Sequence, residues 1–284
     1  FAVDNSLCIV MDKHCFVKVF ATRRSNSVVK KILIESGRGN DILYLTDNLA
    51  FLRALLAKGE KAAAILTEEN RHEDFTGLPY AVEQIEEMEP EDFVRLYRRL
   101  AGLPWEILET KRCRLREMTV SDVDRLYEIY ADASITEFME DLYEDREQER
   151  RYMEEYRKYI YEFYGYGIWI VEEKTSGLVM GRAGVEPKDG EVELGFLIAR
   201  PWQRLGYGYE VCSAILEYVR REIECERVLS RVHPGNRASV GLLEKLGFSK
   251  LKGVDGAELE TWVLPMEKKK EPHPCEDRVL ESSS

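Results

Sequence analysis

One stretch of about forty residues constrains the fold more than any other. The apolar run VELGFLI (192–198) is followed by ARPWQRLGYGYE, in which two glycines, Gly206 and Gly208, stand one residue apart. An amphipathic stretch from about Tyr209 to Ile223 comes next, and a second apolar run, RVLSRV (227–232), follows it. This spacing of apolar residues predicts strand, helix and strand. Because a crossover helix joins parallel strands, the sequence predicts a parallel pair with a glycine-rich loop after its first strand.

The glycine loop has two properties that suit an anion. Glycine has no Cβ atom, so the backbone can turn tightly and approach a ligand closely. The first N–H groups of a helix have no partner within the helix and favour negative charge, for which a pyrophosphate is a natural ligand. An isolated G-x-G pair more often forms a plain strand-to-helix turn, and on these residues alone that alternative stays open.

The elements around this stretch predict a mixed sheet. GIWIVEEK, LVMGRAGVE and EVELGFLIA are strand candidates separated by the short turns KTSG and PKDG, which predicts an antiparallel meander. One helix is expected after Ser121, another from Asn236 to Leu246, and ETWVL closes the sheet. A longer helix between them carries an aromatic stripe, interpreted as core packing: Tyr152, Met153, Tyr156, Ile160, Phe163 and Tyr164. The predicted fold class is therefore α/β (α+β), a mixed central sheet flanked by helices over residues 113–266, with a disordered tail at 267–284.

The N-terminal part predicts a second, smaller domain. From residue 28 to 102, strand-like and helix-like segments alternate, which predicts an α/β layer with a largely parallel sheet in this span. The small α/β domain is expected to cover residues 1–102. Gly37 and Gly39 lie between two of its strands and are interpreted as a turn. LPWEILETKR (103–112) is expected to be a linker.

Composition excludes several classes of protein. With 41 Lys and Arg against 53 Asp and Glu, the net charge of -12 leaves no positive surplus for binding nucleic acid. No apolar stretch reaches the roughly 18 residues that span a bilayer, and no signal-like segment starts the chain, so we expect a cytoplasmic protein without a membrane partner. The six cysteines form no C-x-x-C pair. We expect no metal, because the group Cys8, His14 and Cys15 lacks a fourth ligand at usable spacing.

The glycine loop also carries a family resemblance. QRLGYG fits the Q/R-x-x-G-x-G/A signature of the GNAT superfamily of acyl-CoA-dependent N-acetyltransferases through Gln203, Gly206 and Gly208. CRLREMTVSD resembles the family's first strand and helix start, ELGFLIARPWQRLGYGYEVC its central strand, loop and helix, and NRASVGLLEKLGF its last helix. Together these segments cover roughly residues 113 to 264. LREMT, ELG and N-x-x-S followed by EKLGF are most similar to the ribosomal-protein alanine acetyltransferase type.

The resemblance implies that acetyl-CoA is bound, with its pyrophosphate on the amides of the glycine loop and its pantetheine arm beside the preceding strand. Asn236 and Ser239 occupy positions that contact this arm in the family, although Asn236 fits a helix N-cap equally well. The implied cofactor-binding residues are Phe196, Leu197, Ile198, Gln203, Arg204, Leu205, Gly206, Tyr207, Gly208, Tyr209, Asn236 and Ser239.

Acetyl transfer to a primary amine requires a neutral nitrogen, whereas an alkylamine has a pKa of about 10. Glu193 stands where many family members place a catalytic glutamate and is the candidate base, with an ion-paired glutamate as the alternative. Backbone N–H groups around Leu197 are the candidate oxyanion donors. Many relatives place a tyrosine in the last helix to protonate the leaving thiolate, where this chain has Leu243. The general acid therefore stays open: Tyr166 or Ser239 could serve, or the thiolate could depart without a dedicated acid.

The resemblance therefore implies an acetyl-CoA-dependent N-acetyltransferase whose acceptor is a small molecule or a protein α-amine. Transfer is expected to be direct, in a ternary complex, because Cys212 lies on an apolar helix face that indicates core packing. The alternative is a non-catalytic acyl-CoA-binding sensor or regulatory protein. The oligomeric state stays open, a homodimer included.

Residues 132–146 lie where the family shapes its acceptor site. Their acidic members could attract a cationic amine, although helix starts and a solvated face explain them slightly better. These acidic residues are Asp132, Glu137, Glu140, Asp141, Glu144 and Asp145.

Residues 28–102 resemble, more weakly, the α/β layer of haloacid-dehalogenase-type proteins. A phosphatase of that type needs a D-x-D-x-T loop, which is missing here. Asp4 and Asp12 are isolated, and Thr46 resembles only a later motif. We therefore expect a degenerate domain with a structural or acceptor-recognising role and no phosphatase activity.

Overall fold

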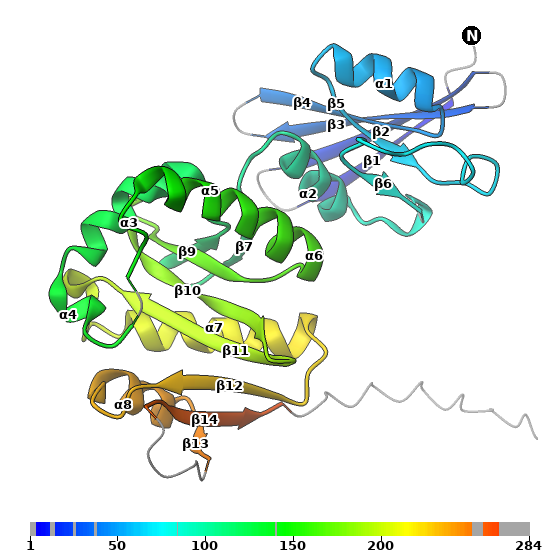
Figure 1. Ribbon diagram of the computed structural model, residues 1–284. Coiled ribbons are helices and arrows are strands. Elements are labelled where there is room, and N and C mark those ends of the chain that lie inside the picture. Colours follow the sequence, from blue (N-terminus) through cyan, green and yellow to red (C-terminus); the bar gives the residue numbers. More distant parts are fainter. Residues whose placement is uncertain are drawn as a thin grey trace, which may run out of the picture. The chain divides into compact units, whose positions relative to one another are not determined.

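A computed structural model of the chain describes residues 4–11, 15–24, 27–36, 39–83, 85–139, 141–251 and 258–266. The chain divides into two compact units, Phe1–Trp105 and Glu106–Ser284 (Figure 1). Some features named above lie outside the described residues: Asp12, His14, Gly37, Glu140, residues 267–284 and the side chains of Asp4, Cys8 and Cys15.

The first unit contains a six-stranded sheet in the order β1-β2-β3-β4-β5-β6. Its elements are β1 (Asp4–Met11), β2 (Cys15–Arg24), β3 (Ser27–Ser36), β4 (Gly39–Thr46), α1 (Leu49–Ala57), β5 (Lys61–Ile65), β6 (Ala81–Val82), η1 (Ile85–Glu87) and α2 (Pro90–Leu100). Strands β1 to β4 pair antiparallel in chain order, whereas β4, β5 and β6 pair parallel. The largely parallel sheet expected for residues 28–102 is confirmed there in two of three pairings, since β4-β5 and β5-β6 are parallel and β3-β4 is antiparallel. The antiparallel strands β1 and β2 extend the sheet outside that prediction. Only two or three residues separate the first four strands, which fits hairpins and is too short for a crossover.

Alternate residues of β5 contact different helices. Ala62 and Ala64 pack with Leu52 of α1, whereas Ala63 belongs to the cluster that contains Phe93 of α2. Because successive side chains of a strand point to opposite faces, α1 and α2 cover opposite faces of the sheet.

The second unit contains an eight-stranded sheet in the order β13-β14-β12-β11-β10-β9-β8-β7. Its strands are β7 (Glu106–Glu109), β8 (Cys113–Arg116), β9 (Ile168–Glu173), β10 (Val179–Lys188), β11 (Glu191–Ile198), β12 (Arg227–Val232), β13 (Ser249–Lys250) and β14 (Glu260–Pro265). Its helices are η2 (Val120–Asp122), α3 (Val123–Tyr130), α4 (Ala133–Thr136), α5 (Arg146–Tyr156), η3 (Arg157–Tyr161), α6 (Glu162–Tyr164), η4 (Arg200–Trp202), α7 (Tyr207–Glu222) and α8 (Arg237–Lys245). The predicted meander β9-β10-β11 and the predicted parallel pair β11-β12 are both confirmed.

The expected linker at 103–112 differs from the structure in one respect. Residues 106–109 form β7, which pairs antiparallel with β8 and ends the sheet. The four-residue segment EILE is too short and too charged for its pattern to indicate a strand, and pairing with β8 decides its conformation.

Helices cover both faces of this sheet. Trp169 of β9 packs edge-on against Tyr218 of α7, with ring centroids 5.3 Å apart. On β10, Ala183 is the register partner of Trp169, and Glu186, three residues further, accepts a hydrogen bond from Tyr156 of α5. An odd separation along a strand reverses the side chain, so α7 and α5 lie on opposite faces.

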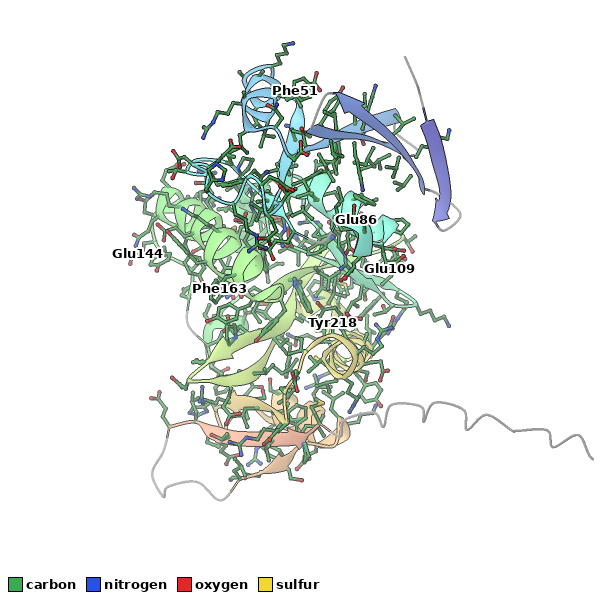
Figure 2. All side chains as sticks on the ribbon, turned by 90° about the vertical axis from the view of Figure 1, so that its right-hand side faces the viewer. Phe51, Glu86, Glu109, Glu144, Phe163 and Tyr218 are labelled. Atoms are coloured by element: carbon green, nitrogen blue, oxygen red, sulfur yellow. The ribbon has the colours of Figure 1, made fainter. Side chains whose placement is uncertain are left out.

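The long helix predicted before β9 contains a π-helical turn, η3. This turn accommodates an extra residue and rotates the helix face, so that Tyr156 and Tyr161 are both buried. The Tyr156 hydroxyl accepts a hydrogen bond from the Ile168 amide at 2.9 Å, and the Tyr161 hydroxyl donates to the Ile168 carbonyl. Phe163 is left 77 % exposed (Figure 2). The expected aromatic stripe is therefore wrong beyond the π-turn, because its positions assume 3.6 residues per turn.

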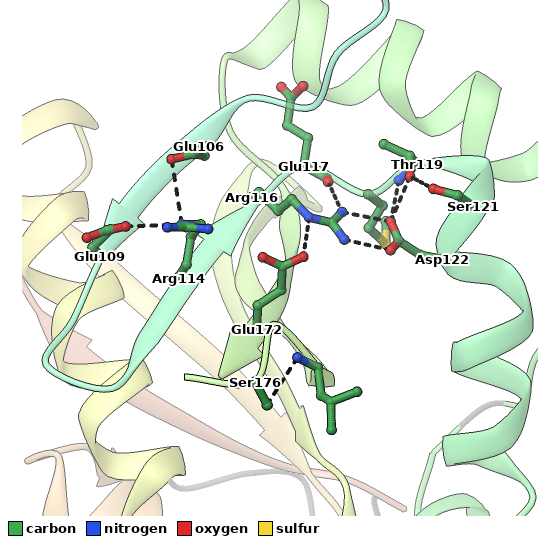
Figure 3. Close-up of polar contacts among 12 residues, drawn as sticks. Glu106, Glu109, Arg114, Arg116, Glu117, Thr119, Ser121, Asp122, Glu172 and Ser176 are labelled. Carbon is green, nitrogen blue, oxygen red and sulfur yellow. Dashed lines mark hydrogen bonds and ion pairs between the residues drawn. The ribbon is translucent and has the colours of Figure 1, made fainter. Parts of the chain in front are cut away.

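Arg116 on β8 joins three elements through buried ion pairs (Figure 3). Its guanidinium donates to Asp122 of η2 at 2.7 and 2.8 Å and to Glu172 of β9 at 2.7 Å. Burial opposes the charge on Arg116, but the bonds to Asp122 and Glu172 outweigh it and raise the pKa of Arg116. The start of the first long helix of this unit is thus fixed to the sheet.

Candidate functional site

The parallel pair β11-β12 separates soon after it begins. In the described residues its register covers Val192 with Val228 and Glu193 with Leu229. One step further, the Ser230 hydroxyl reaches the Leu194 carbonyl at 3.0 Å. β11 continues to Ile198 beyond this point, so its last four residues face a gap between the two strands.

The strand register decides which amides face the gap. The Ala199 amide donates to the Met180 carbonyl of β10 at 2.7 Å, so the backbone groups of Ala199 and Leu197 point to β10. Those of Phe196 and Ile198, one residue out of phase, point to the β12 side. The sequence indicated donors around Leu197. The structure commits Leu197 itself to the sheet and leaves the amides of Phe196 and Ile198 on the gap edge.

The glycine loop begins where β11 ends. The side-chain amide of Gln203 donates to the Ile198 carbonyl at 2.8 Å and holds the loop to the strand end. Arg204 and Gly206 both have positive φ, at 59° and 84°, and Gly206 is the N-cap of α7. Intrahelical bonding begins with the Glu210 amide, which donates to the Gly206 carbonyl at 3.1 Å. The three preceding amides, 207–209, therefore lie ahead of the first intrahelical bond.

Different physical constraints act at the two glycine positions, Gly206 and Gly208. Gly206 is required by its left-handed conformation, which other residues adopt only with strain. At Gly208 a Cβ would lie 3.2 Å from Leu242 Cδ2 of α8, so the end of the Leu242 side chain would have to shift by a few tenths of an ångström. The first turn of α7 thus packs closely against α8 while its amide end stays at the mouth of the gap.

Glu193 lies on the α5 face of the gap, because its register partner on β10 is Glu186, which α5 contacts through Tyr156 at 3.1 Å. Its carboxylate forms an ion pair with Arg231 of β12 at 2.5 Å, and Arg231 also reaches Asp189 at 3.1 Å. The side chain of Glu193 is 12 % exposed. The ion-paired alternative for Glu193 is therefore present in the structure.

The amides of Phe196 and Ile198 on the β12 side of β11 and the start of α7 thus lie near the same end of the strand. Residues 112–249 match the acetyltransferase (GNAT) domain family. Over 146 residues the chain is 30 % identical to the uncharacterized protein YkkB of Bacillus subtilis. The match covers 50 % of this chain and 84 % of that protein. The chain belongs to the GNAT acetyltransferase family. Its second unit contains the acyltransferase domain.

Two further similarities concern ribosomal proteins. A stretch of 57 residues is 35 % identical to the [ribosomal protein uS5]-alanine N-acetyltransferase of Escherichia coli, covering 20 % of this chain and 29 % of that enzyme. The solved structure of RimL, a ribosomal L7/L12 α-N-protein acetyltransferase in complex with coenzyme A, is 14 % identical, with a TM-score of 0.48 over 58 % of this chain and all of that one. The family match does not extend to residues 28–102, so their haloacid-dehalogenase resemblance stays a prediction.

Asn236 caps α8, the last helix of the GNAT domain, as its alternative interpretation predicts. Its side chain accepts a hydrogen bond from the Ser239 amide at 3.1 Å. Leu243 is fully buried and packs in the core. Tyr166 lines a cavity of about 770 Å³ where β11 and β12 begin, at the opposite end of these strands from the gap. Tyr166 is therefore poorly placed to act as an acid there.

Helix starts account for two of the six acidic residues in the segment 132–146 of the GNAT domain. Asp132 caps α4 by accepting from the Ser134 amide at 3.0 Å, and Asp145 caps α5 by accepting from the Glu147 amide at 3.0 Å. The hydroxyl and amide of Ser134 lower the pKa of Asp132. These two carboxylates are therefore committed to the backbone.

Sequence reasoning missed two residues of the second unit that contact the start of α7. Arg112 and Thr110 lie in the turn between β7 and β8, inside the expected linker, and both bind the first turn of α7. No local pattern marks them, because their partners lie about a hundred residues away.

Proposed function

We propose that this chain is an acetyl-CoA-dependent N-acetyltransferase that transfers the acyl group directly to a primary amine in a ternary complex. The observation that carries this proposal is the early separation of β11 from β12, with the glycine loop at the mouth of the gap. In the reaction the amine nitrogen bonds to the thioester carbonyl carbon, the C–S bond breaks, and a proton leaves the nitrogen.

The backbone supplies binding groups of the required kind. The amides of residues 207–209 suit a pyrophosphate, since they precede the first bond of α7 and stand at its positive end. The gap-edge amides of Phe196 and Ile198 suit the amide-rich pantetheine arm and the negative charge that develops on the carbonyl oxygen. In this proposal Gln203, Arg204 and Leu205 shape the loop, while Asn236 and Ser239 border the arm.

Glu193 is the proposed base. It lies on the α5 face of the strand whose amides line the gap, and Arg231 holds its carboxylate in one orientation. The departing thiolate needs no dedicated acid in this proposal, because a thiol with a pKa of about 8.5 is a good leaving group. That fits the fully buried Leu243.

The ion pair favours one class of acceptor. A protein α-amine has a pKa of about 8, whereas a lysine-like amine has one above 10, so near pH 7.5 roughly a quarter of an α-amine is neutral but less than about one per cent of a lysine-like amine. The carboxylate of Glu193 is already paired with Arg231, which suits an acceptor amine that is partly neutral without proton removal by a base. Together with the similarity to the alanine N-acetyltransferase, this supports a protein or peptide α-amine as acceptor.

The test combines calorimetry with turnover. Acetyl-CoA is titrated into the full chain, and acetyl transfer is measured on an alanine-starting peptide, its N-blocked form and a panel of small amines. Glu193→Gln should lower kcat by about 10²-fold or more with unchanged acetyl-CoA affinity. Glu191→Gln is the matched control, because Glu191 is on the same strand and pairs with Arg227 away from the gap.

Each negative result has a separate meaning. Wild type that binds acetyl-CoA but acetylates no amine would overturn the enzyme proposal in favour of the acyl-CoA sensor. Absence of binding by folded wild type would overturn both. Equal turnover by the Glu193 and Glu191 variants would remove Glu193 as the base.

A further inference from the structure

Arg112 contacts three parts of the glycine loop and the helix that follows it. Its Nε atom donates to Glu210 Oε2 at 2.7 Å, and its Nη1 atom donates to the Leu205 carbonyl at 3.1 Å. The guanidinium also lies over the Tyr207 ring, 3.9 Å from the ring centroid. One side chain from the β7-β8 turn therefore fixes the residues on both sides of Gly206.

Glu210, in the first turn of α7, is held from the same turn. Its Oε1 atom accepts hydrogen bonds from the Thr110 hydroxyl at 2.6 Å and from the Arg112 amide at 2.8 Å. Burial opposes the charge on Glu210, but the bonds from Thr110 and Arg112 outweigh it and lower the pKa of Glu210. Glu210 is thus a carboxylate anchored at the helix start.

That carboxylate creates an electrostatic conflict. The N-terminus of α7 is where the proposed pyrophosphate binds, and two anions within several ångströms repel each other strongly where water is partly excluded. Arg112 pairs with Glu210 by its Nε atom. Its Nη2 atom lies beside Gly206, 3.6 Å from where a Cβ would stand. The positive charge is therefore shared between the carboxylate and the loop.

We propose that Arg112 is a positioning residue for acyl-CoA binding. It fixes Leu205 and Tyr207 in the binding conformation of the loop and cancels the charge of Glu210, so that the start of α7 accepts a pyrophosphate. This inference rests on the proposed acetyl-CoA site. It assigns a binding role to the β7-β8 turn.

The experiment measures acetyl-CoA affinity by calorimetry in the full chain. Arg112→Met should weaken binding at least tenfold, and Arg112→Lys should lie between it and wild type, because lysine keeps the charge but cannot reach Glu210 and Leu205 together. Glu210→Gln alone should stay within threefold of wild type. Adding it to Arg112→Met should recover part of the loss, because the unpaired anion is then gone.

A second substrate separates positioning from general damage. S-acetylpantetheine carries the thioester but no pyrophosphate, so its kcat/KM should be the same in wild type and Arg112→Met, while KM for acetyl-CoA rises at unchanged kcat. Arg114→Met is the matched control, since Arg114 is the neighbouring exposed arginine on β8.

Four results would count against the inference. Arg112→Met binding within twofold of wild type would overturn it, as would equal losses with acetyl-CoA and S-acetylpantetheine. A double variant as weak as Arg112→Met would overturn the charge cancellation. A folded wild type that binds no acetyl-CoA would instead overturn the proposed function on which the inference rests.

Discussion

Replacing Arg116 by methionine should destabilise the second unit far more than the same change two residues earlier on the same strand. The side chains of Arg116, Asp122 and Glu172 are 13 %, 5 % and 15 % exposed. Arg116→Met leaves both carboxylates with little water and without their counter-charge. Breaking one side of a buried ion pair costs about 3–5 kcal/mol. Asp122 keeps its bond from the Thr119 amide, so we expect about 3 kcal/mol.

Arg114 provides the matched comparison (Figure 3). It pairs with Glu106 and Glu109, and all three side chains are at least 41 % exposed. Water screens such a pair, so Arg114→Met should cost less than about 1 kcal/mol.

The assay is urea unfolding followed by tryptophan fluorescence. A Trp105→Phe background removes the tryptophan of the first unit and leaves Trp169, Trp202 and Trp262 to report on the second. With a slope of about 2 kcal/mol per M, Arg116→Met should lower the urea midpoint by about 1.5 M and Arg114→Met by less than about 0.5 M. Similar shifts for the two variants would refute the argument from burial.

Three further outcomes are expected. A Cβ at Gly184 would lie 2.1 Å from the Gly167 carbonyl oxygen, so Gly184→Ala should lower the free energy of unfolding by at least about 3 kcal/mol. Gly241 has open space around it, so Gly241→Ala should raise the free energy of unfolding by about 0.5–1 kcal/mol. Thermal melts that show equal shifts for the two variants would contradict this. Burial raises the pKa of the Cys212 thiol, so Cys212→Ala should keep kcat within twofold, and an acetylated Cys212 in mass spectra would contradict direct transfer. Bonds from the Ser176 hydroxyl and amide lower the pKa of Glu173 to about 2. Its stabilising contribution should be complete above the ordinary value of 4.5 and lost as pH falls toward 2, and a carboxyl NMR titration midpoint near 4.5 would contradict this.

Local patterns predicted the GNAT sheet because its connections carry strong signals. The turns KTSG and PKDG are too short for anything but hairpins, and the helix after the glycine loop is long enough to cross between parallel strands. The same reasoning was less complete in the first unit. There β1 and β2 went unrecognised, and Gly37 and Gly39 indicated a turn but not the antiparallel pairing of β3 and β4.

The candidate site was only partly predictable, for a different reason. A pattern can place Glu193 on a strand, but its pairing with Arg231 depends on the register between β11 and β12. The π-turn that buries Tyr161 has no signature at the level of apolar spacing, since it is stabilised by the Tyr161 hydroxyl bond to Ile168. Side chains whose partners are distant in sequence cannot be assigned from local patterns.

The strand β7 has a consequence for anyone who isolates the acetyltransferase unit. It is a short edge strand with a glutamate at each end, which is how natural sheets discourage pairing with foreign strands. A fragment cut at residue 112, where the family match starts, would lose this protection and expose the backbone of β8 along its outer edge. Such a fragment should aggregate, whereas one that begins at residue 103 keeps both the protected edge and Thr110.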